Sequence, residues 1–399
     1  MSTLTAQLVP ETEAQACAMI AEARAQGRTL AIEGGGTRAG FGRPMQADCV
    51  LSTRALTGIT LYEPAELVIS ARAGTPLSFI EETLAQKGQM LPFEPADYRG
   101  LYGTAGEPTI GAVAACNISG PRRIQTGAAR DSLIGVRLVN GRGEAIKSGG
   151  RVMKNVTGLD LVKLCCGAHG TLGLFTEVTF KLLPRPPAEA SLALDGLDDA
   201  QAIRAMSATL SSPFEVSGVA HLPTGLSGGA PLTLVRLERD EISLAYRLQR
   251  LTDLLGPFGA VRRIGPEESR AHWHDIAQVA PLAKSATPAI WRLSLPAHHA
   301  ARCMAAISAS LGARYFYDWA GGLVWLAVMP NGDAGAGAIR HAVVEAGGHA
   351  TLMRASDNVR ARVDVFPPLG AALMKITAGI KTSFDPGGIL NPGRMYAGV

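Results

Sequence analysis

The sequence lacks the marks of several protein classes. Its six cysteines contain no C-x-x-C pair, which excludes a zinc ribbon and an iron–sulfur cluster of that spacing. No apolar run reaches the roughly 18 to 20 residues of a membrane-spanning helix. Lysines and arginines are dispersed, so the net charge of +4 forms no basic stripe of the kind that indicates nucleic-acid binding.

The N-terminal segment also lacks the pattern of a secretory leader. Glu11 and Glu13 stand where a signal peptide has a cationic start and an apolar segment. The six scattered cysteines are expected to be reduced thiols. Together with the absence of a leader pattern, they predict a cytoplasmic protein. With 399 residues, 47% of them hydrophobic and only 18% charged, the chain is long enough for two or three domains with large cores.

Glycine, by contrast, is abundant. The 46 glycines exceed the ordinary share of about 7% and have no fixed period, which excludes a collagen-like repeat. Many gather in three clusters, at residues 33–40, 107–131 and 167–177. These clusters are where we expect the chemistry of the protein to lie.

The pattern of polar and apolar residues predicts a mixed α and β chain. Residues 12–26 are expected to form an Ala-rich helix capped by Thr12. Asn140 and Gly141 predict the turn of a β-hairpin. Residues 92–127 are rich in glycine and poor in periodicity, so we expect an extended loop there. Short strands are expected at 29–32, 49–52, 58–62, 67–71 and 172–183.

The run Pro184-Arg185-Pro186-Pro187 has the strongest linker signature in the chain. We therefore expect a first domain over residues 1–185. Strands and helices alternate over 186–355, which predicts an antiparallel α+β unit with helices on one face of its sheet. A turn-rich tail over 356–399 contains one expected helix, at 369–382.

The first cluster only partly matches a nucleotide-binding fingerprint. Gly34, Gly36 and Ala39 satisfy G-x-G-x-x-A after a strand, but more glycines and a proline follow where a Rossmann helix should begin. No Lys-Ser/Thr pair follows, which excludes a P-loop. A tight strand–loop–strand turn remains. Either its backbone N–H groups face an anion such as a pyrophosphate, or the glycines only allow the tight turn and no ligand binds there.

The three clusters in this order resemble the FAD-binding flavoproteins of the vanillyl-alcohol oxidase and p-cresol methylhydroxylase (PCMH) superfamily. Residues 155–161, between the second and third clusters, and Leu390-Asn391-Pro392-Gly393 near the end add to the resemblance. It implies an α+β chain with a PCMH-type FAD-binding domain of two subdomains, then an antiparallel-sheet cap domain. The C-terminal segment is expected to pack back on the FAD domain.

The resemblance also implies which residues hold the cofactor. The first cluster would wrap the pyrophosphate, the second would line the pyrophosphate and flavin, and the third would hold the adenine-ribose or pyrimidine side. Residues 33–42 contain no His, the residue that holds flavin covalently in some relatives, so FAD is expected to be non-covalent. The expected cofactor-binding residues are Gly34, Gly35, Gly36, Thr37, Arg38, Pro108, Thr109, Ile110, Gly111, Asn117, Ser119, Gly120, Arg122, Gly170, Gly173, Leu174 and Asn391.

Within this superfamily the chain is similar to the FAD-binding E subunits of bacterial glycolate oxidase. That resemblance implies a subunit of a complex that oxidises glycolate to glyoxylate and passes electrons onward. The implied partners are a larger flavin subunit and an iron–sulfur subunit, in the cytoplasm or peripherally at the inner membrane through those partners. The segments that carry it are 119–123, 127–131, 152–160, 318–325 and 391–395.

Oxidation of a 2-hydroxy acid needs a cation or metal for the carboxylate and a base for the hydroxyl proton. Arg292 and Arg236, both on expected strands, are the catalytic candidates, against the alternative that each faces solvent. Histidines at 272/274 and 298/299 do not share a helix face, so no metal site is expected.

Two classes of function therefore stay open. Either this chain oxidises the 2-hydroxy acid at its own FAD, alone or in a complex, or it is a non-catalytic or electron-relay subunit. A flavin reductase of the same fold is disfavoured by the Asn391-Pro392-Gly393 ending.

Overall fold

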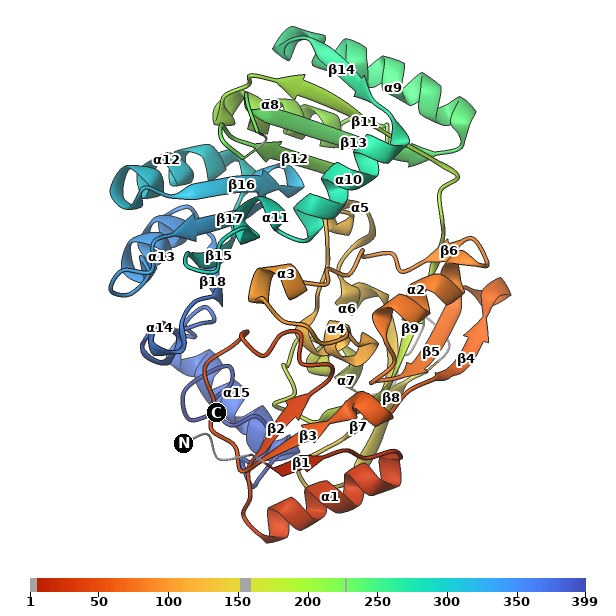
Figure 1. Ribbon diagram of the computed structural model, residues 1–399, viewed down its shortest axis with the longest axis vertical. Coiled ribbons are helices and arrows are strands. Elements are labelled where there is room, and N and C mark those ends of the chain that lie inside the picture. The colour runs from red at the N-terminus through yellow and green to blue at the C-terminus, as the bar shows by residue number, and fades with distance from the viewer. Residues whose placement is uncertain (1–5, 151–158, 227) are drawn as a thin grey trace.

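The computed structural model describes residues 6–150, 159–226 and 228–399. Of the segment 152–160 that carries part of the sequence resemblance, residues 152–158 lie outside the described residues. The described residues form an upper sheet of eight strands and a lower part with smaller sheets of three, five and two strands (Figure 1). In the described ranges we find no helix whose length and apolar character suit a membrane crossing.

The first small sheet has three parallel strands and is covered by one helix. The strands are β1 (Ala6–Leu8), β3 (Cys49–Ser52) and β2 (Leu30–Glu33), in that order, and the helix is α1 (Glu13–Ala25). As expected, Thr12 caps α1: its side chain accepts a hydrogen bond from the Gln15 N–H. Ala16 and Ile20 of α1 are fully buried in a core shared with β2 and β3, which fixes the point where β2 enters the first glycine cluster.

The second small sheet has five antiparallel strands in the order β4-β5-β9-β7-β8. Its strands are β4 (Ile59–Glu63), β5 (Val68–Arg72), β9 (Leu174–Lys181), β7 (Leu133–Val139) and β8 (Ala145–Gly149). The β7–β8 hairpin forms at the predicted Asn140-Gly141 turn. Helix α2 (Leu77–Ala85) and α4 (Ile110–Cys116) pack into the core of this sheet.

The expectation of an extended loop over 92–127 is wrong, because three short helices form there. They are α3 (Arg99–Tyr102), α4 and α5 (Arg123–Thr126). Helix α4 has the sequence Ile-Gly-Ala-Val-Ala-Ala-Cys and lacks a polar face, since most of it is buried. A helix without a polar face has no amphipathic period, which is why the sequence did not reveal it.

The cap sheet has eight antiparallel strands in the order β14-β11-β13-β12-β16-β17-β15-β18. Its strands are β11 (Ala188–Asp195), β12 (Gly218–Leu222), β13 (Leu232–Arg239), β14 (Val261–Ile264), β15 (Ala289–Ser294), β16 (Arg314–Asp318), β17 (Leu323–Val328) and β18 (His349–Arg354). The sequence pattern predicts cap strands near 214–220, 231–237, 289–295, 314–319 and 322–328, so β11, β14 and β18 were not foreseen. Residues 190–194 of β11 are buried toward both faces, which removes the alternation that marks a strand.

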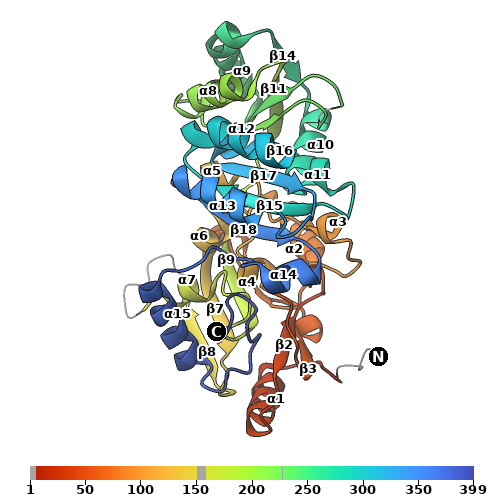
Figure 2. The same ribbon diagram turned by 90° about the vertical axis from the view of Figure 1, so that its left-hand side faces the viewer.

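Helices cover both faces of the cap sheet, where the sequence predicted one. Figure 2 shows helices on the outer face and others on the opposite face. The outer helices are α8 (Asp199–Leu210), α9 (Glu241–Leu255), α12 (Ala300–Leu311) and α13 (Ala336–Glu345), and the inner ones are α10 (Pro266–Ala277) and α11 (Ala280–Ala283).

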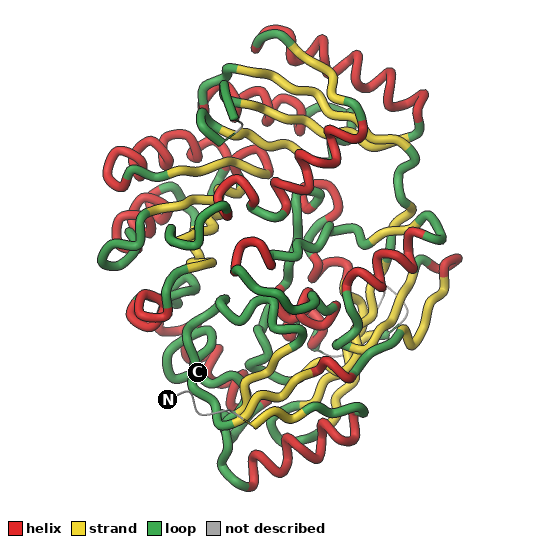
Figure 3. The backbone as a smooth tube through the Cα atoms, viewed as in Figure 1, coloured by secondary structure: helices red, strands yellow, loops and turns green. Residues whose placement is uncertain are grey.

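Strand pairing changes across the proline-rich segment. β10 (Leu183–Pro184) pairs with β6 (Gln89–Met90) in the lower part, whereas β11 pairs with β13 in the cap. We therefore propose the domain division made from the sequence, at 185/186 and 355/356. Figure 3 shows that much loop backbone lies between the cap sheet and the lower sheets, where these parts meet.

The C-terminal tail returns to the lower part. After α14 (Asp357–Arg362) and α15 (Ala371–Phe384), Leu390 forms a parallel bridge with Leu30 beside β2. The buried Lys381 ammonium donates hydrogen bonds to the Thr171 carbonyl, the Leu390 carbonyl and the Asp385 carboxylate. The tail thus joins the end of β2 to the third glycine cluster.

A network of ion pairs joins the cap to the lower part. Glu94 and Arg122 come from the lower part, and Arg236 and Glu238 come from β13. The Arg236 guanidinium donates to both Glu94 carboxylate oxygens, at 2.8 and 2.9 Å, and Arg122 pairs with both Glu94 and Glu238. Burial would raise the pKa of Glu94, but the two guanidiniums outweigh it and lower that pKa to about 2.

Replacement of Glu94 by Ala should destabilise the protein by about 3 kcal/mol, because Arg236 and Arg122 lose a shared counter-charge. Removing one partner of a buried ion pair costs roughly 3 to 5 kcal/mol. The lower value applies here because 24% of the Glu94 side chain is exposed. Urea unfolding at pH 7 measures this. Glu82→Ala, at an exposed position of α2, is the control and should change stability little.

The wild type and Glu94→Ala, compared over a range of pH, also test the pKa of Glu94. Because its folded-state pKa of about 2 lies below the ordinary 4.5, the carboxylate stabilises the fold fully above about pH 4.5 and loses this contribution as pH falls toward 2. The stability difference between the wild type and Glu94→Ala should therefore shrink between pH 4.5 and pH 2. A difference that stays constant over that range would contradict the assignment.

Candidate functional site

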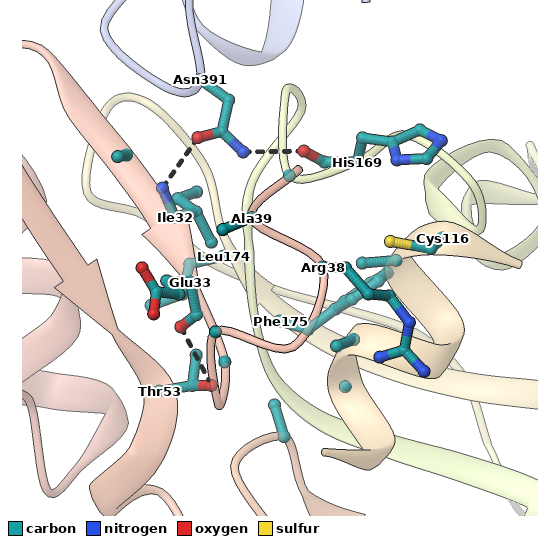
Figure 4. A pocket seen from close by; sticks show the side chains of 18 of the residues that line it. Ile32, Glu33, Arg38, Ala39, Thr53, Cys116, His169, Leu174, Phe175 and Asn391 are labelled. Atoms are coloured by element: carbon teal, nitrogen blue, oxygen red, sulfur yellow. Dashed lines mark hydrogen bonds between the residues drawn. The ribbon is translucent and has the colours of Figure 1, made fainter. Parts of the chain in front are cut away.

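The three glycine clusters meet around one cavity of about 270 Å³ in the lower part (Figure 4). They reach it from the end of β2, from α4 and from the turn before β9. Ten of the residues expected from the sequence line it: Gly34, Gly35, Gly36, Thr37, Arg38, Gly111, Gly170, Gly173, Leu174 and Asn391. We call it the glycine-lined cavity.

The first cluster is shaped by a crossing of two backbones. A Cβ added to Gly35 would overlap the Glu107 carbonyl oxygen, and one added to Gly106 would overlap the carbonyl oxygen of Gly35. Each glycine is therefore required because the other loop leaves no room for a side chain. This contact holds the loop after β2 against the segment that leads into α4.

The same loop presents unpaired backbone donors to the cavity. Among the hydrogen bonds of the described residues, none has its donor in the backbone N–H of residues 35–38. Gly36 has a φ of +75°, a left-handed backbone conformation that residues with a Cβ rarely adopt. Neighbouring unpaired N–H groups form a concave anion site, as a pyrophosphate requires.

The second cluster contributes one face of α4. Gly111, Ala112, Ala115 and Cys116 line the cavity, and a Cβ on Gly111 would stand 2.6 Å from that of Ala73. Thr109 lies just behind the wall, beside Gly34, and its buried hydroxyl has no hydrogen-bond partner among the described residues. Two neighbouring expected residues lie elsewhere, since Ile110 is buried in the core and Pro108 lines a different cleft.

The tail closes the cavity through Asn391. Its side-chain oxygen accepts a hydrogen bond from the Ile32 N–H at 2.7 Å, and its NH₂ donates to the His169 carbonyl at 2.7 Å (Figure 4). Asn391 thus connects the end of β2 with the third cluster, at the point where Gly170 has a φ of +73°. This amide positions the wall of the cavity through both of its polar atoms.

A second cavity, of about 200 Å³, lies where the cap meets the lower part. It shares Phe41, Cys116 and His169 with the glycine-lined cavity, so the two are adjacent. We call it the junction cavity. It is also lined by Tyr98, Asn117, Ile118, Ser119, Arg123, Gly167, Arg292, Thr351, Met353 and Phe366.

The wall between the two cavities is apolar and uncharged. The ring of His169 lies edge-on to Phe41 with centroids 4.9 Å apart and also packs against Phe366. Burial, and the nearby charge of Arg394, lower the pKa of His169 to about 3, so its imidazole is neutral at pH 7. Sequence reasoning did not single out Phe41, His169 or Tyr98. His169 lies within the third glycine cluster, but only Gly170, Gly173 and Leu174 of that cluster were expected to bind the cofactor.

Three more expected residues line neither cavity. Arg122 was expected beside the cofactor and Arg236 at the catalytic centre, but both guanidiniums are held in the ion-pair network with Glu94 and Glu238. Gly120 also lies outside, and a Cβ there would approach the Glu94 carbonyl to 2.6 Å. We therefore retain neither arginine as a site residue. Arg292 does line the junction cavity.

Asn117 and Ser119 have structural hydrogen bonds at the junction cavity. The Asn117 side chain accepts from the Arg130 N–H, and the Ser119 hydroxyl accepts from the Ala129 N–H. Within the described ranges, no three or more His, Cys, Asp or Glu side chains are grouped so that they could hold a metal ion.

Comparisons with known proteins agree with this geometry. Residues 5–149 match the model of the FAD binding domain family. The chain is 35% identical to the glycolate oxidase subunit GlcE of Escherichia coli over 368 residues, which cover 92% of this chain and 93% of that protein. Over 37% of its length it is 30% identical to the glycolate oxidase subunit GlcD of Bacillus subtilis, covering 30% of that protein.

Solved structures agree on the fold. The structure of p-cresol methylhydroxylase with substrate bound superposes with a TM-score of 0.74 at 15% identity, over 97% of this chain and 88% of that one. A 4-ethylphenol oxidase from Gulosibacter chungangensis superposes with a TM-score of 0.72 at 14% identity, over 98% and 89%. The expected fold class, a PCMH-type FAD-binding domain with an antiparallel α+β cap, is confirmed.

The residues present fit FAD. Its pyrophosphate needs several hydrogen-bond donors in one place, and the unpaired N–H groups of residues 35–38 supply them. The cofactor is long, and because the two cavities are adjacent, one end of it would extend to the boundary between them. We propose residues 34–38, Gly111, Gly170, Gly173, Leu174 and Asn391 as the binding set.

Gly35→Ala should abolish flavin retention, because the new methyl group displaces the loop from Glu107 and with it the donors of residues 35–38. The ratio of visible to ultraviolet absorbance of the purified protein measures this. Gly100→Ala is the matched control, since Gly100 has ordinary φ and no atom within 4 Å of an added Cβ. Retention of flavin by Gly35→Ala would refute the placement of the loop.

Ala112→Leu separates cofactor loss from misfolding. Leucine favours a helix, and its larger side chain would project from α4 into the glycine-lined cavity. We expect at least about tenfold weaker FAD binding, with far-UV circular dichroism and the unfolding of the flavin-free protein preserved. Unchanged affinity would show that FAD lies elsewhere.

Proposed function

Because the chain belongs to the family of the glycolate oxidase subunit GlcE, we propose that it is an FAD-dependent subunit of a glycolate oxidase. In this proposal the complex oxidises glycolate to glyoxylate and passes the electrons onward. FAD is held non-covalently, since residues 33–42 contain no His.

One structural observation supports the proposal independently of sequence similarity. The glycine-lined cavity, with its unpaired donors, opens beside a second cavity between the two domains. A long cofactor held at its pyrophosphate in the first cavity would present its far end to a small molecule in the second. Ligand sites between domains are common in enzymes.

The chemistry divides between cofactor and chain. Oxidation of glycolate removes two electrons and two protons from the hydroxyl-bearing carbon and its oxygen, and bound FAD supplies the acceptor for the electrons. The chain holds the cofactor through residues 35–38. The rings of Phe41, Phe366 and the neutral His169 pack against one another and form a wall that would limit access of water.

We propose a larger flavin subunit and an iron–sulfur subunit as partners. GlcE and GlcD carry the names of subunits of one oxidase, and this chain is similar to both. The complex would operate in the cytoplasm or at the surface of the inner membrane through its partners. An enzyme active without partners is the alternative, as is a subunit that binds FAD without catalysis.

Anaerobic mixing of the purified, flavin-loaded chain with glycolate, and separately with D-lactate, tests the proposal. If this chain oxidises the substrate itself, its visible flavin absorbance should bleach in a stopped-flow experiment without partners. Bleaching that appears only after partner subunits are added would place the oxidation in the complex. A preparation that has no flavin and cannot be reconstituted with FAD would overturn the proposal.

A further inference from the structure

Two arginines line the junction cavity from opposite sides of the domain boundary. Arg123 belongs to α5 of the lower part, and Arg292 belongs to β15 of the cap. Among the described residues, neither side chain forms a hydrogen bond or an ion pair. By contrast, their neighbours Arg122 and Arg236 have carboxylate partners.

Both guanidiniums lie against one indole ring. The guanidinium carbon is 4.7 Å from the centroid of Trp319 for Arg123 and 5.3 Å for Arg292. A cation–π contact uses the flat face of a guanidinium and leaves its in-plane N–H groups free. Trp319 therefore holds both cations in place without using the donors that would bind a carboxylate.

The backbone at Trp319 is strained. Trp319 and Ala320 have φ values of +52° and +55°, a conformation that costs about 1 to 3 kcal/mol for each non-glycine residue. The strand before it ends in Asp318, whose carboxylate accepts a hydrogen bond from the Trp319 N–H at 2.8 Å. Strain that the surrounding fold maintains is common where a side chain must be held for binding.

Within residues 6–150, 159–226 and 228–399, no carboxylate forms an ion pair with Arg123 or Arg292. The acidic group that acts on Arg123 is Asp131, which accepts a hydrogen bond from the Ala128 N–H. The acidic groups that act on Arg292 are the Tyr98 phenol and, to a lesser extent, Asp318, whose pKa is raised to about 7 by burial. Burial also lowers the pKa of both arginines. Uncompensated charge of this kind is costly unless an anion joins it.

The rest of the cavity suits a small polar molecule. Thr351 pairs with Arg292 across β18 and β15, so both side chains lie on the same face of the sheet. The hydroxyl of Tyr98, from the loop before α3, has no hydrogen-bond partner among the described residues. At about 200 Å³ the cavity admits a compound of a few carbon atoms.

We propose that Arg123 and Arg292 form a carboxylate-binding subsite that takes the acid group of a short 2-hydroxy or 2-oxo monocarboxylate. The ligand would bridge the lower part and the cap. Its other end would point toward the glycine-lined cavity, past Phe41 and His169. The identity of this ligand as substrate or product rests on the proposed function.

Calorimetric titration of the flavin-loaded chain with oxamate tests the subsite, because oxamate is a small monocarboxylate that this chemistry does not oxidise. Arg292→Met and Arg123→Met should each weaken oxamate binding at least about tenfold, the effect of losing a charge-assisted hydrogen bond. Arg292→Lys, which keeps the charge and loses the planar fork, should weaken it less. Arg302→Met, at an exposed position of α12, should bind as the wild type does.

Glycolamide, which is similar in size to glycolate but uncharged, distinguishes charge from shape. Its binding should be weak and equal in all five proteins, and oxamate should shift the visible flavin spectrum of the wild type. Equal oxamate affinity in the wild type and both Met variants would overturn the inference. So would an equal loss of glycolamide and oxamate binding, which would mean that the arginines only shape the cavity.

The two proposals fail in distinguishable ways. A wild-type protein that retains FAD but binds no oxamate would refute the subsite and leave the cofactor assignment intact. A protein that binds oxamate through both arginines, yet is not reduced by glycolate with or without partners, would support the subsite and overturn the substrate of the proposed function.

Discussion

Two stretches of backbone cross at Gly35 and Gly106 with no space for a side chain on either. This crossing is the constraint on which the site depends. It presses the loop after β2 against the segment before α4, and the backbone N–H groups of residues 35–38 are left without acceptors in the protein. The tail then fixes the opposite wall, because Asn391 connects Ile32 to His169. Backbone packing thus leaves a cavity lined by unpaired N–H groups, with Arg38 and Arg394 also in its lining.

The cap completes the site by a different kind of interaction. The ion pairs among Glu94, Arg122, Arg236 and Glu238 fasten β13 to the lower part. With the cap held there, the strand that bears Arg292 faces the helix that bears Arg123. The same boundary thus contains paired arginines, which hold the domains together, and unpaired ones, which are available to a ligand. Those two roles explain why a chain with only 18% charged residues keeps four arginines in this region.

The parts of the fold and the site that could be predicted from the sequence are those determined by residues close together in the chain. The hairpin at Asn140 and the cap of α1 by Thr12 depend on adjacent residues, and both were predicted correctly. The glycine clusters indicated the cavity, because close backbone approach is a local requirement with a clear residue signature. Arg122 and Arg123 show the limit: they are neighbours in the sequence, yet one is turned to Glu94 and the other to the junction cavity. Their different surroundings depend on where the cap lies against the lower part, and no short sequence pattern encodes that position.

A crystal structure of the flavin-loaded chain would test the central claim most directly, namely that the loop after β2 holds the cofactor by its pyrophosphate. We predict that pyrophosphate oxygens lie about 3 Å from backbone nitrogens of residues 35–38. The ring system of the flavin should lie at the boundary formed by Phe41 and His169, next to the junction cavity. A pyrophosphate that makes no contact with this loop, or a flavin ring at the opposite end of the glycine-lined cavity, would contradict the account.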